Sequence, residues 1–130
     1  MISKVRQLVI PLADAPGTLA ELCGALGDEK VNILAILAPE TKEEGRVRVM
    51  VDDMPRAREV LTRAKIGFSE EEALDIELDN RPGAFGQLAG RFAAAKINIR
   101  YAYATTTSFG RARVIVAVRD PDKALAALGG

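Results

Sequence analysis

The stretch Asp14-Ala15-Pro16-Gly17-Thr18-Leu19 returns 66 residues later as Asn80-Arg81-Pro82-Gly83-Ala84-Phe85. Over residues 14–34, seven of 21 positions are identical to their counterparts at this offset. The match continues at an offset of 65 or 66, through Val31-Asn32-Ile33 and Ile97-Asn98-Ile99, Gly45-Arg46 and Gly110-Arg111, and Pro55 and Pro121. Because an internal repeat dictates architecture, the chain is predicted to hold two copies of one unit, 1–68 and 69–130.

The hydrophobic period changes in the same order in both copies. Apolar residues first alternate as in a strand, as at Leu8, Ile10 and Leu12, and then follow the helical spacing of Leu19, Leu22 and Leu26. Short apolar segments at 31–38 and 97–104 and alternating valines at 47–51 and 114–118 predict two further strands. Asp-Pro signals near Pro55 and Pro121 predict a second helix in each copy. Each unit therefore reads β-α-β-β-α.

A fourth strand is less well defined by the sequence. In the first copy the acidic run Glu70-Glu71-Glu72 fits either a short strand or, preferably, a solvated turn. In the second copy we expect no matching strand and an open sheet edge. The prediction is an α+β chain of two tandem ferredoxin-like (βαββαβ) units, antiparallel sheets with helices on one face. Because 31–38 is apolar on both faces, we also expect a partner there, and self-association.

Composition excludes several functions. Eighteen Lys plus Arg balance eighteen Asp plus Glu, so no net charge attracts nucleic acid or anionic lipid. Histidine is absent, which argues against catalytic triads and metal sites, and we expect neither catalytic residues nor a cofactor. The single Cys23 fits the core and a reducing compartment, and no apolar stretch is long enough to span a membrane. We therefore expect a cytoplasmic protein without nucleic-acid or membrane partners.

The repeated loop is the candidate binding site. Pro and Gly shape a turn that leads into a helix, whose first amides and dipole attract a carboxylate. The side-chain oxygen of Asp14 or Asn80 could accept from an ammonium group or cap the helix. Asn32 and Asn98 follow at the same spacing, and a polar side chain among apolar neighbours needs a partner. Each loop thus offers complementary groups for both ends of an α-amino acid.

The combination of a strand, Asp/Asn-x-Pro-Gly-x-Leu/Phe, an amphipathic helix, Val/Ile-Asn-Ile and a hairpin resembles ACT domains, which are regulatory modules that bind amino acids. The resemblance covers nearly the whole chain twice. It implies a stand-alone ACT pair, with ligands near the Pro-Gly loops at interfaces between ACT units. The positions that it assigns to the ligand are Asp14, Ala15, Pro16, Gly17, Thr18, Leu19, Asn32, Asn80, Arg81, Pro82, Gly83, Ala84, Phe85 and Asn98.

Two features favour a particular ligand and loop. Some members of the family carry histidine two residues before the loop Asp or Asn, where this chain has Leu12 and Leu78. This departure disfavours small polar ligands such as serine and favours an apolar amino acid near Leu78 and Phe85. Asp14 would repel a carboxylate, whereas Asn80 is neutral, so the second loop is the one expected to be occupied if only one is.

Three function classes follow from the sequence. The first is a homodimeric, allosteric sensor of a free amino acid that regulates an enzyme or transporter. The second is an acylphosphatase-like hydrolase, for which Arg81 and Asn98 are the only candidate pair. The third is a protein-interaction domain whose loops bind no ligand. The doubled Pro-Gly loop favours the first.

Overall fold

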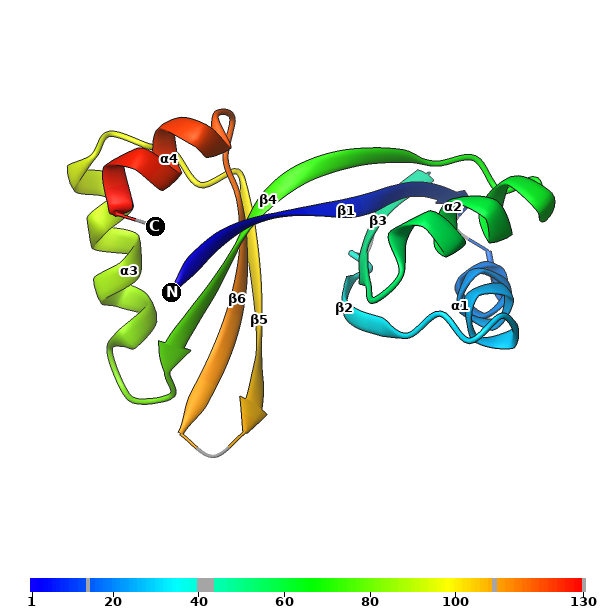
Figure 1. The fold of residues 1–130 in the computed structure, drawn as a ribbon, viewed down its shortest axis with the longest axis horizontal. Helices are drawn as coiled ribbons and strands as arrows, with labels where there is room; N and C mark the ends of the chain where they lie inside the picture. Colours follow the sequence, from blue (N-terminus) through cyan, green and yellow to red (C-terminus); the bar gives the residue numbers. More distant parts are fainter. Residues whose placement is uncertain (14, 40–43, 109, 130) are drawn as a thin grey trace. The chain divides into compact units, whose positions relative to one another are not determined.

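The computed structural model describes residues 1–13, 15–39, 44–108 and 110–129 (Figure 1). Ten helices and strands follow one another in these residues: β1 (Ile2–Ala13), α1 (Thr18–Asp28), β2 (Ile33–Leu37), β3 (Glu44–Val51), α2 (Met54–Arg63), β4 (Ser69–Asp79), α3 (Ala84–Ala94), β5 (Tyr101–Ser108), β6 (Arg111–Ala117) and α4 (Pro121–Leu128). The strands form an antiparallel sheet in the order β2-β3-β1-β4-β6-β5. The fold is α+β, with two tandem ferredoxin-like units as predicted.

The chain divides into two compact units, one of Gln7–Glu71 and the other of Met1–Arg6 together with Glu72–Gly130. These units differ from the expected 1–68 and 69–130 because two long strands, β1 and β4, each contribute to both units. β1 gives its first residues to one unit and the rest to the other, and β4 changes unit after Glu71.

In the unit Gln7–Glu71, the helices α1 and α2 cover the sheet face formed by alternate residues of β1 and β3. Leu8 and Ile10 from β1 lie opposite Val49 and Val47 from β3, and all of these side chains are buried. Leu22 and Leu26 of α1 complete this core with Ala57, Val60 and Leu61 of α2. The alternation and the helical spacing in the sequence correctly identified Leu8, Ile10, Leu22 and Leu26, but Leu19 is exposed and Cys23 is only half-buried, outside this core cluster.

In the other unit, α3 and α4 pack against β4 and β6 in the same way (Figure 1). Leu74 and Ile76 lie opposite Val116 and Val114, and Phe92 of α3 is buried among them. The expectation of an open edge in this unit is wrong. The chain's first residues lie there, with the amide of Glu77 donating to the carbonyl of Met1 at 3.1 Å and Lys4 pairing with Glu72 at 3.2 Å.

The acidic run is part of β4, not a solvated turn. Glu70 and Glu71 are half-buried because arginines of their own unit neutralise them. Arg58 donates to both carboxylate oxygens of Glu70 at 2.7 and 2.8 Å, and Arg48 donates to Glu71 at 3.1 Å. Such paired charge-assisted bonds allow carboxylates to lie along a strand.

The repeat has a different register in its third strands from the one read in the sequence. β1 pairs Leu8 with Val49, and β4 pairs Leu74 with Val116, so the counterpart of Val49 is Val116, not Val114. Since the difference is two residues, each side chain stays on the expected sheet face. The second strands are also displaced: β2 is shorter than 31–38, and β5 begins at Tyr101, four residues later than expected.

Candidate functional site

The loop between β4 and α3 turns on Gly83. This residue adopts φ 85°, a left-handed conformation that glycine adopts without steric cost, and it is the N-cap of α3. No side chain caps this helix. Asn80 is therefore not the helix cap that one interpretation of the motif suggested. Its backbone amide donates to the carbonyl of Gly110 at 2.8 Å, which ties the loop to the start of β6.

The first turn of α3 presents backbone donors. Within the loop, Ala84 donates to the Arg81 carbonyl at 3.2 Å and Gln87 donates to the Gly83 carbonyl at 2.9 Å. Phe85 and Gly86 lie between these two residues, and their backbone amides have no acceptor among the described residues. A helix start with free amides attracts an anion through these donors and through the helix dipole.

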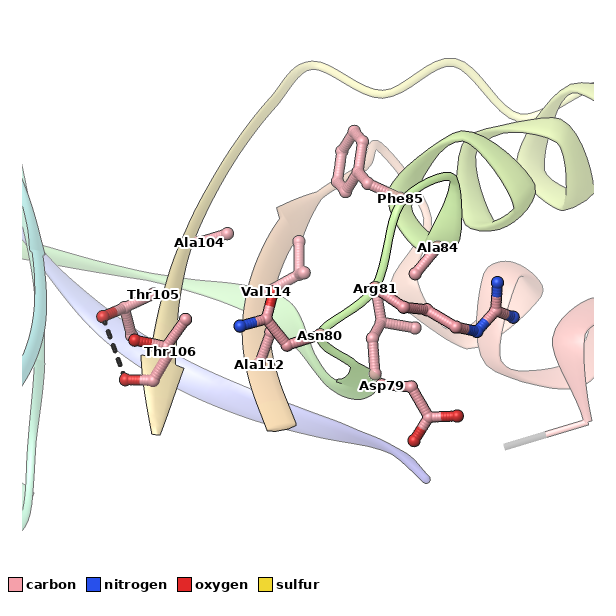
Figure 2. A pocket seen from close by; sticks show the side chains of 11 residues that line it. Asp79, Asn80, Arg81, Ala84, Phe85, Ala104, Thr105, Thr106, Ala112 and Val114 are labelled. Carbon is pink, nitrogen blue, oxygen red and sulfur yellow. Dashed lines mark hydrogen bonds between the residues drawn. The ribbon is translucent and has the colours of Figure 1, made fainter. Parts of the chain in front are cut away.

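A pocket of about 290 Å³ opens beside this helix start, between the loop, β5 and β6 (Figure 2). Its lining is mainly apolar, with a few polar side chains. Four predicted site residues line it, namely Asn80, Arg81, Ala84 and Phe85, together with Leu78, Asp79, Ala104, Thr105, Thr106, Ala112 and Val114. An apolar cavity with a few polar groups at one side is the usual form of a small-molecule site.

Figure 2 shows how the labelled side chains lie. Asn80 projects between the loop and the strands β5 and β6, and the ring of Phe85 stands on the first turn of α3. The guanidinium of Arg81 points away from β5, where it donates to Gln87 Oε1 at 2.9 Å. The carboxylate of Asp79 also points away, and Arg111 donates to its Oδ1 at 2.6 Å. The polar loop side chain directed toward the strands is thus the uncharged carboxamide of Asn80.

A second pocket, of about 310 Å³, lies on the other flank of the same loop and is more polar. Arg81, Arg91 and Arg111 line it with Glu77 and Asp79. Each arginine already has a partner. Arg91 donates to the Leu128 carbonyl at 2.6 Å, Arg111 donates to Asp79, and Arg81 donates to Gln87. This flank is a network of internal contacts.

The first loop differs at its helix start. Gly17 repeats the left-handed N-cap with φ 90°, but the counterpart of Ala84 is Thr18, whose hydroxyl donates to the carbonyls of Ala13 and Ala15 at 3.0 and 3.1 Å. Ala15, Pro16, Gly17 and Leu19 are all exposed. Asp14 lies outside the described residues.

The remaining predicted positions do not line either of these pockets. Pro82 and Gly83 form the turn itself, and the side chains of Asn32 and Asn98 are exposed. The Asn32 backbone amide donates to Asp52 Oδ1 at 2.9 Å, and the Asn32 carbonyl accepts from the Asp52 backbone amide at 3.0 Å. Arg81 and Asn98, the pair that a hydrolase would use, do not share a pocket among the residues described here.

The sequence interpretation missed the contribution of the hairpin. Ala104 and Thr106 face Val114 and Ala112 across the β5–β6 pair, and all four line the pocket. A register shift between Thr106 and Ser108 sets this pairing, and no sequence pattern indicates it. The signal that was available is the pair of small residues Ala104 and Ala112, which line the pocket next to the loop.

Ionic groups continue along β4 and β6. Burial raises the pKa of Asp75, and the nearby Arg113 guanidinium opposes this effect only in part. Arg113 Nε lies 3.1 Å from Asp75 Oδ1, yet it is a buried atom without a well-directed hydrogen-bond partner. We therefore regard the pair as close but poorly aligned, in agreement with an ion pair that offsets only part of the burial cost.

Among the described residues, no group of three or more His, Cys, Asp and Glu side chains gathers as metal ligands do. None of the helices in the described part of the chain is both long and apolar enough to cross a bilayer.

Comparisons with known proteins agree with this fold. Protein BT0572 from Bacteroides thetaiotaomicron has a structure similar to this one, with a TM-score of 0.91, 26% identity and coverage of 98% of this chain and 88% of that chain. The regulatory subunits of aspartate kinase from Thermus thermophilus and Thermus flavus share the fold, with TM-scores of 0.69 and 0.61 and identities of 19% and 20%. Each comparison covers 98% of this chain and 94% of the subunit.

No curated protein matches the sequence. A family model described as ACT domain pair matches residues 3–126, which is nearly the whole chain. The chain therefore belongs to the ACT domain pair family.

Proposed function

We propose that this ACT domain pair is a cytoplasmic regulatory protein that binds a small apolar amino acid at its second Pro-Gly loop and has no catalytic activity of its own. The observation that carries the proposal is the pocket beside α3. It combines an apolar wall, an uncharged polar side chain and the open start of a helix.

The two ends of an α-amino acid find complementary groups there. The carboxylate would lie at the amides of Phe85 and Gly86, where the helix dipole favours negative charge. The ammonium group would donate to the side-chain carbonyl of Asn80. The ligand's side chain would then contact Leu78 and Val114, which form part of the apolar lining.

The pocket also supports the expectation about the ligand's chemistry. Leu78, at the position where some family members have histidine, contributes an apolar surface. The charged groups nearest the loop, Arg81 and Asp79, are already bound to Gln87 and Arg111. An aliphatic or aromatic side chain therefore fits better than a polar one.

The regulated target is proposed by analogy. Two of the proteins with this fold are regulatory subunits of aspartate kinase. We infer that this chain likewise passes its liganded state to an enzyme or transporter. A pair without a ligand, acting only as an interaction domain, is the competing function, and binding measurements distinguish the two.

The experiment is a thermal unfolding panel against the twenty amino acids at millimolar concentration. A ligand that binds only the folded state stabilises it by about 2.7 kcal/mol at a hundredfold excess over its dissociation constant. We expect a rise in the melting temperature with one group of related apolar amino acids. No rise with any of them would favour the interaction domain.

Two variants show whether the pocket is responsible. Ala104→Leu places three more carbons on an exposed pocket position and should abolish the ligand-induced rise. Ala38→Leu, at the corresponding exposed position of the other unit, should leave the rise unchanged. If both variants respond to the ligand like the parent protein, the ligand binds elsewhere.

A further inference from the structure

We propose that the polar pocket of about 310 Å³ on the second flank of the β4–α3 loop binds a small organic dianion, that is, a molecule with two acidic groups on a short carbon skeleton. The guanidinium groups of Arg81 and Arg91 would hold its two acidic groups. This site does not depend on the amino-acid site, because Gln87 and Arg91 line the polar pocket and not the apolar one.

The charges around the polar pocket are unevenly paired. Three arginines line it, Arg81, Arg91 and Arg111, and so do two carboxylates, Glu77 and Asp79. Both carboxylates lie beside the same arginine, since Arg111 is 2.6 Å from Asp79 and 3.6 Å from Glu77. Arg81 and Arg91 have no carboxylate partner within the part of the chain that the structure describes. Two guanidinium groups of one pocket are therefore left without an ion pair.

Uncharged partners hold these two guanidinium groups in place. Arg81 donates through Nη2 to Gln87 Oε1 at 2.9 Å, and Arg91 donates through Nη2 to the carbonyl of Leu128 at 2.6 Å. A guanidinium has further N–H groups, and those of Arg81 and Arg91 have no other acceptor in the described ranges. A side chain that is already oriented loses less freedom on binding, so both groups are prepared for an anion.

The lining also indicates what kind of anion fits. A planar guanidinium binds a carboxylate through two parallel N–H···O bonds, so two guanidinium groups match a ligand with two acidic groups. Leu78, Ala84 and Leu88 belong to the same lining and would contact the carbon atoms between those groups. A cavity of about 310 Å³ is within the range of small-molecule sites, which favours a metabolite over a segment of another protein.

The other unit provides an internal comparison, because its residues correspond at an offset of 66. Arg81, Gln87 and Arg91 correspond to Ala15, Glu21 and Ala25, and each of these three differences makes the polar pocket more positive. Glu77 and Asp79 correspond to Pro11 and Ala13, but these two carboxylates are the ones beside Arg111. The first unit forms the same helix start, at Gly17, without the two arginines. The fold therefore does not require Arg81 and Arg91, which supports a binding role for them.

The test is calorimetric titration of the full chain at constant ionic strength with malonate, succinate and glutarate, which differ in the distance between their two carboxylates. We expect at least one of them to bind with one molecule per chain. Propionate, which has a single carboxylate, should bind at least about tenfold more weakly, since it forms one charge-assisted pair instead of two.

Two variants install the residues of the first unit. Gln87→Glu keeps the size of an exposed side chain but places a carboxylate beside Arg81, and Arg91→Ala removes one guanidinium. Each should raise the dissociation constant of the dicarboxylate by about tenfold or more. Arg119→Ala is the matched control, because Arg119 is an exposed arginine of the same unit that does not line the pocket.

A third variant distinguishes binding from loss of folding. Glu77→Gln removes a carboxylate that competes for Arg111, so it should lower the dissociation constant, which an unfolded chain cannot do. Circular dichroism establishes that each variant is folded. No binding of any dicarboxylate, propionate binding as tight as dicarboxylate binding, unchanged binding in Gln87→Glu and Arg91→Ala, or an equal loss in Arg119→Ala would overturn the proposal. Apolar amino acids carry no second carboxylate, so their thermal-shift panel reads the other site separately and either proposal can fail alone.

Discussion

Gly83 is the single residue on which the geometry of the candidate loop depends most. Its φ of 85° is accessible to other L-residues only at a cost, although an added Cβ would meet no atom within 4 Å. We predict that Gly83→Ala lowers the free energy of unfolding by about 1–2 kcal/mol, the cost of the left-handed conformation. Urea unfolding measures this change.

A helical glycine three residues later is the control for that prediction. Gly86 also has open space around its Cβ position, but it lies inside α3 with no positive φ. Gly86→Ala should therefore raise stability by about 0.5–1 kcal/mol, since alanine favours the helix. Equal effects of the two substitutions would contradict the conformational explanation.

Asp75 gives the fold a dependence on pH. Its pKa in the folded state is raised above the ordinary 3.8, mainly by burial, so the folded protein binds the proton more tightly than the unfolded chain does. Protonation of Asp75 therefore stabilises the folded state. This contribution is complete below the ordinary pKa and is lost as the pH rises through the higher folded pKa. The free energy of unfolding of the parent, minus that of Asp75→Asn, should fall over this window. A rise in that difference, in urea titrations at successive pH values, would reverse the assignment.

Single residues also show what could be predicted about the site. That Asn80, Arg81, Ala84 and Phe85 lie close together could be predicted because the Pro-Gly motif is local and occurs twice, and their binding of a ligand stays a prediction. Thr106 and Ala112 were not, because they reach the pocket only through the register of the β5–β6 hairpin. Local patterns specify a turn, whereas pairing between strands depends on contacts that the pattern does not contain.

At the scale of the element, three helices end in the same way. Lys30, Lys65 and Lys96 have φ values of 61°, 58° and 60° after α1, α2 and α3. In each case the lysine amide and the next amide donate to carbonyls of the last turn, as when Lys96 binds Ala93 and Ile97 binds Phe92, both at 2.9 Å. This is the Schellman motif, in which glycine is the favoured residue at the left-handed position.

We predict that Lys96→Gly stabilises the protein. Glycine avoids the left-handed penalty of about 1–2 kcal/mol but costs about 0.5–1 kcal/mol in chain entropy, so the net gain should be about 0.5–1 kcal/mol. Lys96→Ala keeps a Cβ and should have little effect. Chemical unfolding of both variants checks the prediction, and a glycine variant no more stable than the alanine variant would contradict it.

Elements were predicted well where the hydrophobic period is long and poorly where charge pairing decides. The helices containing Leu22 and Leu88 were predicted from spacing alone. The start of β4 was not, because three successive glutamates indicate a solvated turn until Arg48 and Arg58 are known to lie beside them. That information is non-local.

At the scale of the whole molecule, the repeat predicted the architecture but not the way in which the units are completed. The second copy appeared to lack a fourth strand because no strand follows α4 in the described part of the chain. The unit obtains this strand from the beginning of the chain, residues Met1–Arg6. Each unit therefore contains a segment of a strand that continues into the other unit, and we predict that the halves 1–68 and 69–130 do not fold independently.

This dependence can be tested by removing residues Met1–Arg6. The Glu77 amide would lose its acceptor, the Met1 carbonyl at 3.1 Å, and the outer edge of β4 would be exposed to water. Hydrogen exchange at Glu77 should become faster, because exchange follows local opening. The amides of β1 that face β3, from Leu8 onward, should keep their protection.

The variant Lys4→Ala is the control that separates the backbone contribution from the charge contribution. It removes the ion pairs with Glu72 and Asp122 but keeps the strand, so protection at Glu77 should persist. Unchanged exchange at Glu77 after the deletion would mean that the first residues do not complete this unit.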